Sequence, residues 1–279
     1  MKLTPGLNAI LTGASGGLGT YIAQALSRRQ INLALVAFPG VELEPLRERI
    51  VGSGVRAIAI AADLRISDER KRMLAEAGRF LGPIHILINN AGIEFTSSYH
   101  ELSDESIQDI MRINLEAPML LTKHVLPQML AQALGHIVNV SSLAGKAGPA
   151  FQAPYAATKA GLIAFTSSIR ATYYKSGVSA SLICPGFVEA GIYARLKART
   201  GCVAPLALGT SRPETVAKAV VRAIEKDLPE IIINPIPVRP LFATMALFPS
   251  LGEWMVRQTG AHEFFRRVAE AEKNPKEPL

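Results

Sequence analysis

The sequence has little cysteine and few aromatic residues, and these shortages exclude several classes of protein. Only two cysteines, Cys184 and Cys202, occur in 279 residues, so a disulfide scaffold is excluded and a reducing compartment fits the chain. Cys184 ends an apolar run, which favours a buried and unreactive thiol. The five histidines lack the spacing of metal ligands, so we expect no metal site.

Long hydrophobic runs and runs of like charge are also missing. No uninterrupted apolar stretch reaches ~18 residues, and the N-terminus lacks the apolar core of a signal peptide, so neither a membrane-spanning helix nor secretion is expected. The net charge of +7 permits binding to nucleic acid or anionic lipid, but the aromatic residues (6%) are not interleaved with basic clusters. We therefore expect a cytoplasmic protein that binds no nucleic acid.

Short apolar runs alternate with helical patterns along the chain. The runs typical of strands are 7–12, 31–37, 55–61, 84–89, 136–141, 179–184 and 231–233. Helical patterns lie near 17–29, 41–51, 67–81, from Ser103 past Asn114, and over 154–175 and 212–226. Because the strands are apolar on both faces, the sequence predicts a single Rossmann-type, doubly wound parallel sheet of seven strands with helices on both faces.

Capping patterns and composition give the expected boundaries. Ser103 is predicted as an N-cap, and Ser211 to Glu214 form a capping-box pattern before the helix at 212–226. No linker divides the chain, so we expect a dinucleotide-binding and catalytic domain over 1–235. A helical extension over 236–279 is expected to pack on that same domain.

The first strand leads into a glycine-rich loop. Gly13, Gly17 and Gly19 allow a tight turn and the close approach of a pyrophosphate to the N-terminus of the next helix. The loop is not a P-loop, since no Gly-Lys-Ser/Thr follows it. Other polar motifs follow later strands, and in parallel sheets ligands bind beyond these strand ends.

The motifs together resemble the short-chain dehydrogenase/reductase family over about residues 7–235. The matching features are the Thr-Gly-x3-Gly-x-Gly loop, Asn-Asn-Ala-Gly, a serine thirteen residues before a tyrosine, Tyr-x3-Lys and a Pro-Gly turn. The resemblance implies that Tyr155 is the acid/base, that Ser142 polarises the substrate, and that Lys159 lowers the pKa of Tyr155 and holds the nicotinamide ribose. It further implies that the carbonyl of Asn114 holds a water in a proton relay.

Spacing supports part of this assignment independently. Tyr155 and Lys159 are four residues apart, so their side chains lie on one face of a helix, and a nearby ammonium favours the phenolate. The residues expected to contact the cofactor are Gly13, Ser15, Gly17, Leu18, Gly19, Phe38, Asp63, Leu64, Asn90, Ala91, Gly92, Tyr155, Lys159, Pro185, Gly186 and Val188.

The position that distinguishes the two nicotinamide cofactors carries no charge. An acidic residue after the second strand would bind a ribose diol, and an arginine would pair with a 2′-phosphate, but this chain has Ala37 and Phe38. The cofactor is therefore NAD or NADP, with a lean to NAD because a phosphate dianion needs cationic partners. Arg65, arriving from a loop, is the residue that could reverse this preference.

We interpret the chain as an NAD(P)-dependent oxidoreductase that interconverts a lipophilic alcohol and a ketone or aldehyde, working as a homodimer or homotetramer. A related epimerase or dehydratase, and a dinucleotide-binding sensor without turnover, are the alternatives. The resemblance further implies that the segment 191–209 forms a lid over the substrate.

The apolar side chains of the extension could contact any of three surfaces. Residues 240–258 have helix-spaced apolar side chains flanked by arginines, so they could cover the pocket, contact another subunit or lie on a lipid surface. Packing on the body is the default, and contact with a membrane surface is the minority interpretation.

Overall fold

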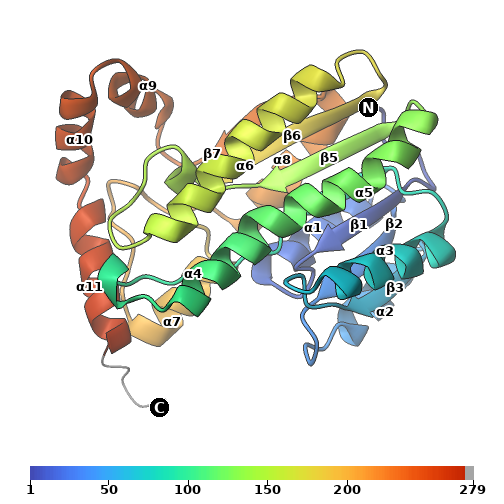
Figure 1. Ribbon diagram of the computed structural model, residues 1–279, viewed down its shortest axis with the longest axis horizontal. Helices are drawn as coiled ribbons and strands as arrows, with labels where there is room; N and C mark the ends of the chain where they lie inside the picture. The colour runs from blue at the N-terminus through green and yellow to red at the C-terminus, as the bar shows by residue number, and fades with distance from the viewer. Residues whose placement is uncertain (274–279) are drawn as a thin grey trace.

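The computed structural model describes residues 1–273, and its centre is a parallel sheet of seven strands (Figure 1). The strands are β1 (Asn8–Thr12), β2 (Asn32–Ala37), β3 (Ala57–Ala61), β4 (Ile86–Asn89), β5 (Gly135–Val140), β6 (Val178–Pro185) and β7 (Glu230–Ile233). Their order is β3-β2-β1-β4-β5-β6-β7, and every neighbouring pair is parallel. This confirms the predicted doubly wound sheet, and the strand order reverses between β1 and β4.

Eleven α-helices surround this sheet within the described residues. They are α1 (Gly17–Ser27), α2 (Glu44–Val51), α3 (Ser67–Leu81), α4 (Asp104–Met111), α5 (Ala117–Ala131), α6 (Ala153–Thr172), α7 (Gly191–Thr200), α8 (Pro213–Lys226), α9 (Arg239–Leu247), α10 (Pro249–Gln258) and α11 (Ala261–Lys273). Successive residues of a strand face opposite sides, so Leu35 packs in the cluster with α1, α2 and α8, and Val36 packs in the cluster with α3 and α5. The sheet therefore has a core on each face.

The long helix expected after Ser103 is interrupted. Ser103 is its N-cap as predicted, and its Oγ accepts a hydrogen bond from the Ser106 amide at 3.1 Å. A π-helical turn over Arg112–Glu116 then separates α4 from α5 and contains Asn114. Such single turns occur preferentially at functional sites, because the extra residue redirects side chains and carbonyls.

The predicted capping box at Ser211 is wrong. The N-cap of α8 is Arg212, whose side chain makes no capping hydrogen bond, and Pro213 occupies the first helical position. The backbone of Ser211 instead forms a parallel bridge with Val188. The backbone pairing of Ser211 with Val188 therefore replaces the predicted capping role. A proline at the first helical position also has no amide N–H that needs a cap.

The extension forms the edge of the molecule drawn in red in Figure 1. Phe264, Phe265 and Val268 of α11 pack against Tyr193 and Leu196 of α7 in a small hydrophobic cluster separate from the two sheet cores. Helices α9 and α10 stand beside the carboxyl ends of the strands. Among residues 1–273, none of the helices combines the length and the apolar character needed to cross a bilayer.

Candidate active site

The glycine loop has the geometry of an anion-binding turn. Gly13 has φ of +65°, and a Cβ on Gly19 would lie 2.1 Å from the Gly13 carbonyl oxygen. Helix α1 begins after Gly16 without a side-chain cap in the described chain, so the amides of its first turn are available to a ligand. A Cβ on Gly17 would lie 2.3 Å from the Gly191 nitrogen, which places the start of α7 against this loop.

Asn90 ties the end of β4 to the glycine loop. Its side-chain amide donates to the carbonyl oxygens of Thr12 at 3.1 Å and Gly13 at 3.0 Å. The Thr12 hydroxyl in turn accepts from the backbone amides of Asn90 and Ala91, each at 3.1 Å. These bonds hold the strand ends together at the point where the strand order reverses, the usual ligand-binding crevice of such sheets.

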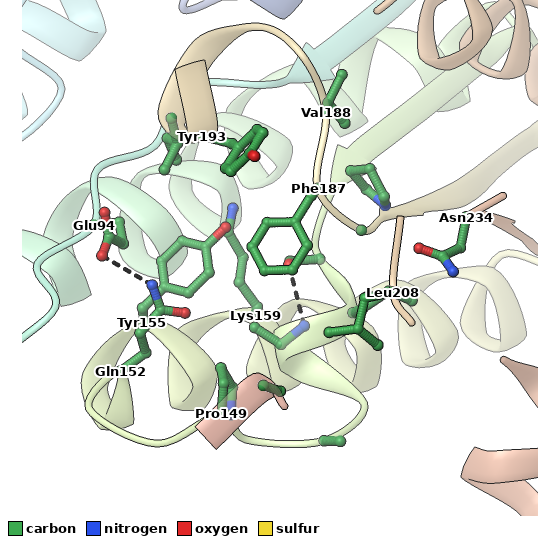
Figure 2. A pocket seen from close by; sticks show the side chains of 18 of the residues that line it. Glu94, Pro149, Gln152, Tyr155, Lys159, Phe187, Val188, Tyr193, Leu208 and Asn234 are labelled. Atoms are coloured by element: carbon green, nitrogen blue, oxygen red, sulfur yellow. Dashed lines mark hydrogen bonds between the residues drawn. The ribbon is translucent and has the colours of Figure 1, made fainter. Parts of the chain in front are cut away.

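Tyr155 and Lys159 lie one turn apart on α6, and Ser142 follows β5. All three line one cavity, which Figure 2 shows from close by. The Lys159 Nζ lies 5.5 Å from the centroid of the Tyr155 ring and donates a hydrogen bond to the Val140 carbonyl at 3.0 Å. The Ser142 Oγ accepts from the Ala144 amide at 3.1 Å, which fixes the serine at the cavity wall.

Burial controls the protonation of this group. It raises the pKa of Tyr155 above its ordinary value; the Ser142 hydroxyl lowers that pKa and the Glu94 carboxylate raises it further. Burial also lowers the pKa of Lys159 to about 8. The sequence predicts that Lys159 lowers the pKa of Tyr155, and this stays a prediction: the shift of the phenol in this structure comes from burial, Ser142 and Glu94.

Asn114 is fully buried in the π-helical turn. Its side chain accepts from the Ile93 amide and donates to the Ile93 carbonyl, both at 2.9 Å, and donates to the Thr158 hydroxyl at 3.4 Å. A Cβ on Gly92 would lie 3.3 Å from Asn114 Oδ1 and 3.5 Å from Lys159 Nζ. The loop at Gly92 therefore passes close to the point where these two side chains converge.

A positively charged side chain, Arg65, lies near the ends of β2 and β3. The Arg65 guanidinium lies 5.6 Å from the centroid of the Phe38 ring, and Phe38 is 52% exposed. Arg65 forms ion pairs with Asp63 at 2.7 Å and Asp109 at 2.6 Å. Its hydrogen bonds hold the pKa of Asp63 below its usual range. Leu64 is buried in the core of the sheet face that α3 and α5 cover.

The cavity has a volume of about 250 Å³ and is mainly apolar. The predicted site residues that line it are Leu18, Asn90, Gly92, Ser142, Tyr155, Lys159, Pro185, Gly186 and Val188. The remaining predicted residues do not line it: Gly13, Ser15, Gly17, Gly19, Phe38, Asp63, Leu64, Ala91 and Asn114. The extension contributes Val238, Leu241, Phe242, Val256, Thr259, Ala261, His262 and Phe265 to the wall.

Sequence reasoning missed a partly buried carboxyl group in the cavity wall. Glu94 accepts hydrogen bonds from the Gln152 side chain at 2.8 Å and from the Thr96 hydroxyl. Burial raises the pKa of Glu94. Figure 2 shows Glu94 and Gln152 beside Tyr155. Their sequence positions could have indicated this pair. Glu94 comes two residues after the Asn-Asn-Ala-Gly element, and Gln152 comes three residues before Tyr155.

The cysteines have no place in this chemistry. Cys184 is buried, and burial raises the pKa of its thiol to about 12, so it is unreactive as predicted. Across residues 1–273, no group of three or more potential metal ligands comes together.

Comparison with known proteins agrees with this geometry. A family model described as short chain dehydrogenase matches residues 7–200. The chain belongs to the short-chain dehydrogenase family. It is therefore an oxidoreductase acting on hydroxyl or carbonyl groups.

Two relatives show how far the similarity extends. The chain is 37% identical over 275 residues to the ketoacyl reductase HetN of a Nostoc species, covering 97% of this chain and 95% of that protein. It is 35% identical over 189 residues to the 3-oxoacyl-[acyl-carrier-protein] reductase FabG of Staphylococcus aureus, covering 67% of this chain and 76% of that protein. The first match takes in most of the C-terminal extension.

Two solved structures share the fold. A metagenomic short-chain oxidoreductase in complex with NADP has a TM-score of 0.71 and 29% identity, covering 85% of this chain and 100% of that one. An actinorhodin polyketide ketoreductase variant with NADPH has a TM-score of 0.76 and 27% identity, covering 81% and 95%.

Proposed function

We propose that this enzyme reduces the ketone of a lipophilic ketoacyl substrate to an alcohol, using a reduced nicotinamide dinucleotide. The observation that carries the proposal is the convergence of Ser142, Tyr155 and Lys159 in the wall of one apolar cavity. The names of two relatives, a ketoacyl reductase and a 3-oxoacyl reductase, support the substrate class. Reduction requires a proton donor beside the substrate oxygen, and the Tyr155 phenol can act as that donor.

Each residue has a definable task. Tyr155 donates its phenolic proton to the substrate oxygen, and the Ser142 hydroxyl holds that oxygen in place by a hydrogen bond. The hydride comes from the nicotinamide ring when the dinucleotide is bound. When the cofactor binds, the Lys159 ammonium gives up its hydrogen bond to the Val140 carbonyl and donates to the ribose instead. Its positive charge also stabilises the phenolate left on Tyr155. The Asn114 carbonyl is proposed to hold a water that returns the proton.

The chain fits a dinucleotide along the strand ends. The uncapped first turn of α1 suits a pyrophosphate, and Gly92 leaves space beside Asn114 and Lys159. We propose NADP(H) rather than the NAD favoured by the sequence, since both solved neighbours were named with NADP or NADPH. In this proposal Arg65 exchanges an aspartate partner for the 2′-phosphate.

The apolar lining supports a lipophilic acyl chain as the substrate. Phe187 and Leu208 line the cavity from the segment that follows β6, and Phe242 and Phe265 line it from the extension. Burying such a chain contributes about 0.8 kcal/mol per methylene group. We therefore expect kcat/KM to rise with acyl length until the cavity is filled.

The test is a steady-state assay with NADPH and a series of β-ketoacyl thioesters of increasing acyl length, followed by the absorbance of the reduced cofactor. Turnover that rises with chain length and is lost in Tyr155→Phe supports the proposal. Dinucleotide binding without turnover on any carbonyl substrate would instead support a sensor. Product formation without net cofactor consumption would support an epimerase or dehydratase.

A further inference from the structure

The junction of α9 and α10 exposes large apolar side chains. We call its residues Leu247, Phe248, Pro249, Leu251 and Trp254 the apolar corner. Leu247 is 73% exposed, Phe248 61% and Trp254 59%. Single exposed apolar residues are ordinary on protein surfaces, but a contiguous group marks an interaction site.

The same two helices form part of the cavity wall with their other side. Leu241 and Phe242 of α9 and Val256 of α10 line the cavity. The helices pack closely, since a Cβ on Gly252 would lie 2.5 Å from the Met245 Cα. The apolar corner is therefore the outer side of a close-packed element that separates the cavity from the surroundings.

A second apolar segment lies beside this element. Val203 is 58% exposed and Leu206 95% exposed in the loop after α7. A Cβ on Gly260 would lie 3.7 Å from the Pro205 Cβ, so this loop adjoins the junction of α10 and α11. Leu208, from the same loop, lines the cavity. Two segments that line the cavity therefore also carry exposed apolar side chains.

We propose that the apolar corner docks on the surface of a phospholipid bilayer and that the lipophilic substrate enters the cavity from the acyl layer. Tryptophan and phenylalanine beside arginines are the composition of an element lying at a membrane interface. Arg239 and Arg257 lie at the outer ends of the helix pair, 67% and 68% exposed in their side chains. Glu253 is the one acidic residue of α9 and α10.

The cavity favours lipid over a second copy of the chain as the occupant. Another protein packed on the corner and on Leu206 would cover the segments that line the cavity. A bilayer would instead hold lipophilic substrate beside those segments. The net charge of +7 adds attraction to anionic lipid.

Trp254 provides a direct probe, because it is the only tryptophan in the chain. The full-length protein is titrated with vesicles of phosphatidylcholine alone and with vesicles that also contain phosphatidylglycerol. We expect the Trp254 emission to shift to shorter wavelength with both types of vesicle. It should also be quenched by lipids that carry bromine on the part of the acyl chain nearest the headgroup. Binding should be tighter with phosphatidylglycerol and weaker with added salt.

Exposed side chains can be changed without disturbing the core. The double variant Leu247→Ser and Phe248→Ser should weaken vesicle binding at least tenfold and leave thermal stability unchanged. Tyr174→Ser is the matched control, since Tyr174 is 74% exposed beyond the far end of α6 and should bind like the wild type. Arg239→Gln and Arg257→Gln should each weaken binding to anionic vesicles about fivefold.

Several outcomes would overturn the proposal. One is an unshifted Trp254 emission with both vesicle types, and another is equal vesicle binding by the double variant and the wild type. A Trp254 shift that grows with protein concentration without vesicles, and a smaller oligomer in the double variant by ultracentrifugation, would assign the corner to a second copy. The substrate route rests on the proposed function, but vesicle binding is measured without turnover, so the two can fail separately.

Discussion

The Glu94 carboxylate accepts a hydrogen bond from the Gln152 side chain at 2.8 Å, and this contact links the loop after β4 to the start of α6. Gln152 is the N-cap residue of α6 and precedes Tyr155 by three residues. Glu94 therefore bonds the residue that begins the catalytic helix and also places a carboxylate near the phenol. Its charge raises the pKa of Tyr155.

Glu94→Gln should change the pH profile of reduction. The reaction needs protonated Tyr155, and removing the carboxylate charge lowers the pKa of this phenol. The alkaline fall in kcat should therefore begin at lower pH than in the wild type, with kcat near neutral pH changed only a few-fold. The measurement is kcat from about pH 8 to about pH 12, where a phenol of raised pKa loses its proton. Coinciding profiles would show that Glu94 has no electrostatic effect on the phenol.

The same variant should change how stability depends on pH. Burial raises the pKa of Glu94 in the folded protein above its unfolded value, so the folded state binds more protons between the two values. Wild-type stability should fall as the pH rises through this window, which begins at about pH 4.3, the ordinary pKa of a glutamate. Glu94→Gln lacks the titrating group and should gain stability relative to the wild type over the same window, as measured by urea denaturation.

Tyr155→Phe should remove the proton donor and leave the fold intact. We expect kcat to fall by about 10²–10⁴, the usual range for a positioned acid, with cofactor affinity little changed. Lys159→Ala should lose both turnover and cofactor affinity, because this lysine serves both. Near-wild-type turnover by Tyr155→Phe on a good substrate would contradict the assigned chemistry.

Arg65→Ala should weaken the binding of NADPH but not that of NADH. Loss of a charge-assisted hydrogen bond of about 1.5–3 kcal/mol should weaken NADPH binding about 10–100-fold and leave NADH binding nearly unchanged. Lys71→Ala is the control, since Lys71 is exposed and its ion pair is with Asp68 of the same helix. Calorimetric titration with both cofactors checks the difference, and equal losses for NADPH and NADH would refute a role at the 2′-phosphate.

His136 should make the fold sensitive to acid. It is buried with its Nε2 2.9 Å from the Ser181 hydroxyl, and burial lowers its pKa to about 3. Below about pH 6.5 the unfolded chain binds a proton that the folded chain does not, so stability should fall by about 1.4 kcal/mol per pH unit. His136→Gln should reduce this slope in urea denaturation, whereas His100→Gln, at an exposed position, should keep it.

Two phenylalanines of the extension should differ sharply when replaced by alanine. Phe264 is fully buried against α7, so Phe264→Ala should cost about 3–5 kcal/mol and raise KM by loosening α7 beside the cavity. Phe248 is exposed, so Phe248→Ala should change stability by less than about 0.5 kcal/mol. Chemical denaturation and KM for a long acyl substrate measure both. Similar stability losses would mean that the corner is structural.

The sequence by itself determined the sheet and the identity of the candidate catalytic group. Alternating apolar runs predict parallel strands, and parallel strands bring their carboxyl ends to one edge. Motifs far apart in the chain therefore had to meet there. The spacing of Tyr155 and Lys159 also needs nothing beyond the helix period. These features depend on local periodicity and on one topological rule.

Only the tertiary structure decided the contacts between distant segments. Arg65 meets Asp109 across 44 residues of sequence, and Gln152 meets Glu94 across 58. No local pattern encodes such pairs, because they depend on how helices and loops pack at the strand ends. Burial likewise raises the pKa of the Tyr155 phenol, which no sequence pattern indicates. It also divided the extension into one side that lines the cavity and an apolar corner that faces outward, since hydrophobicity alone does not say which side a neighbour will cover.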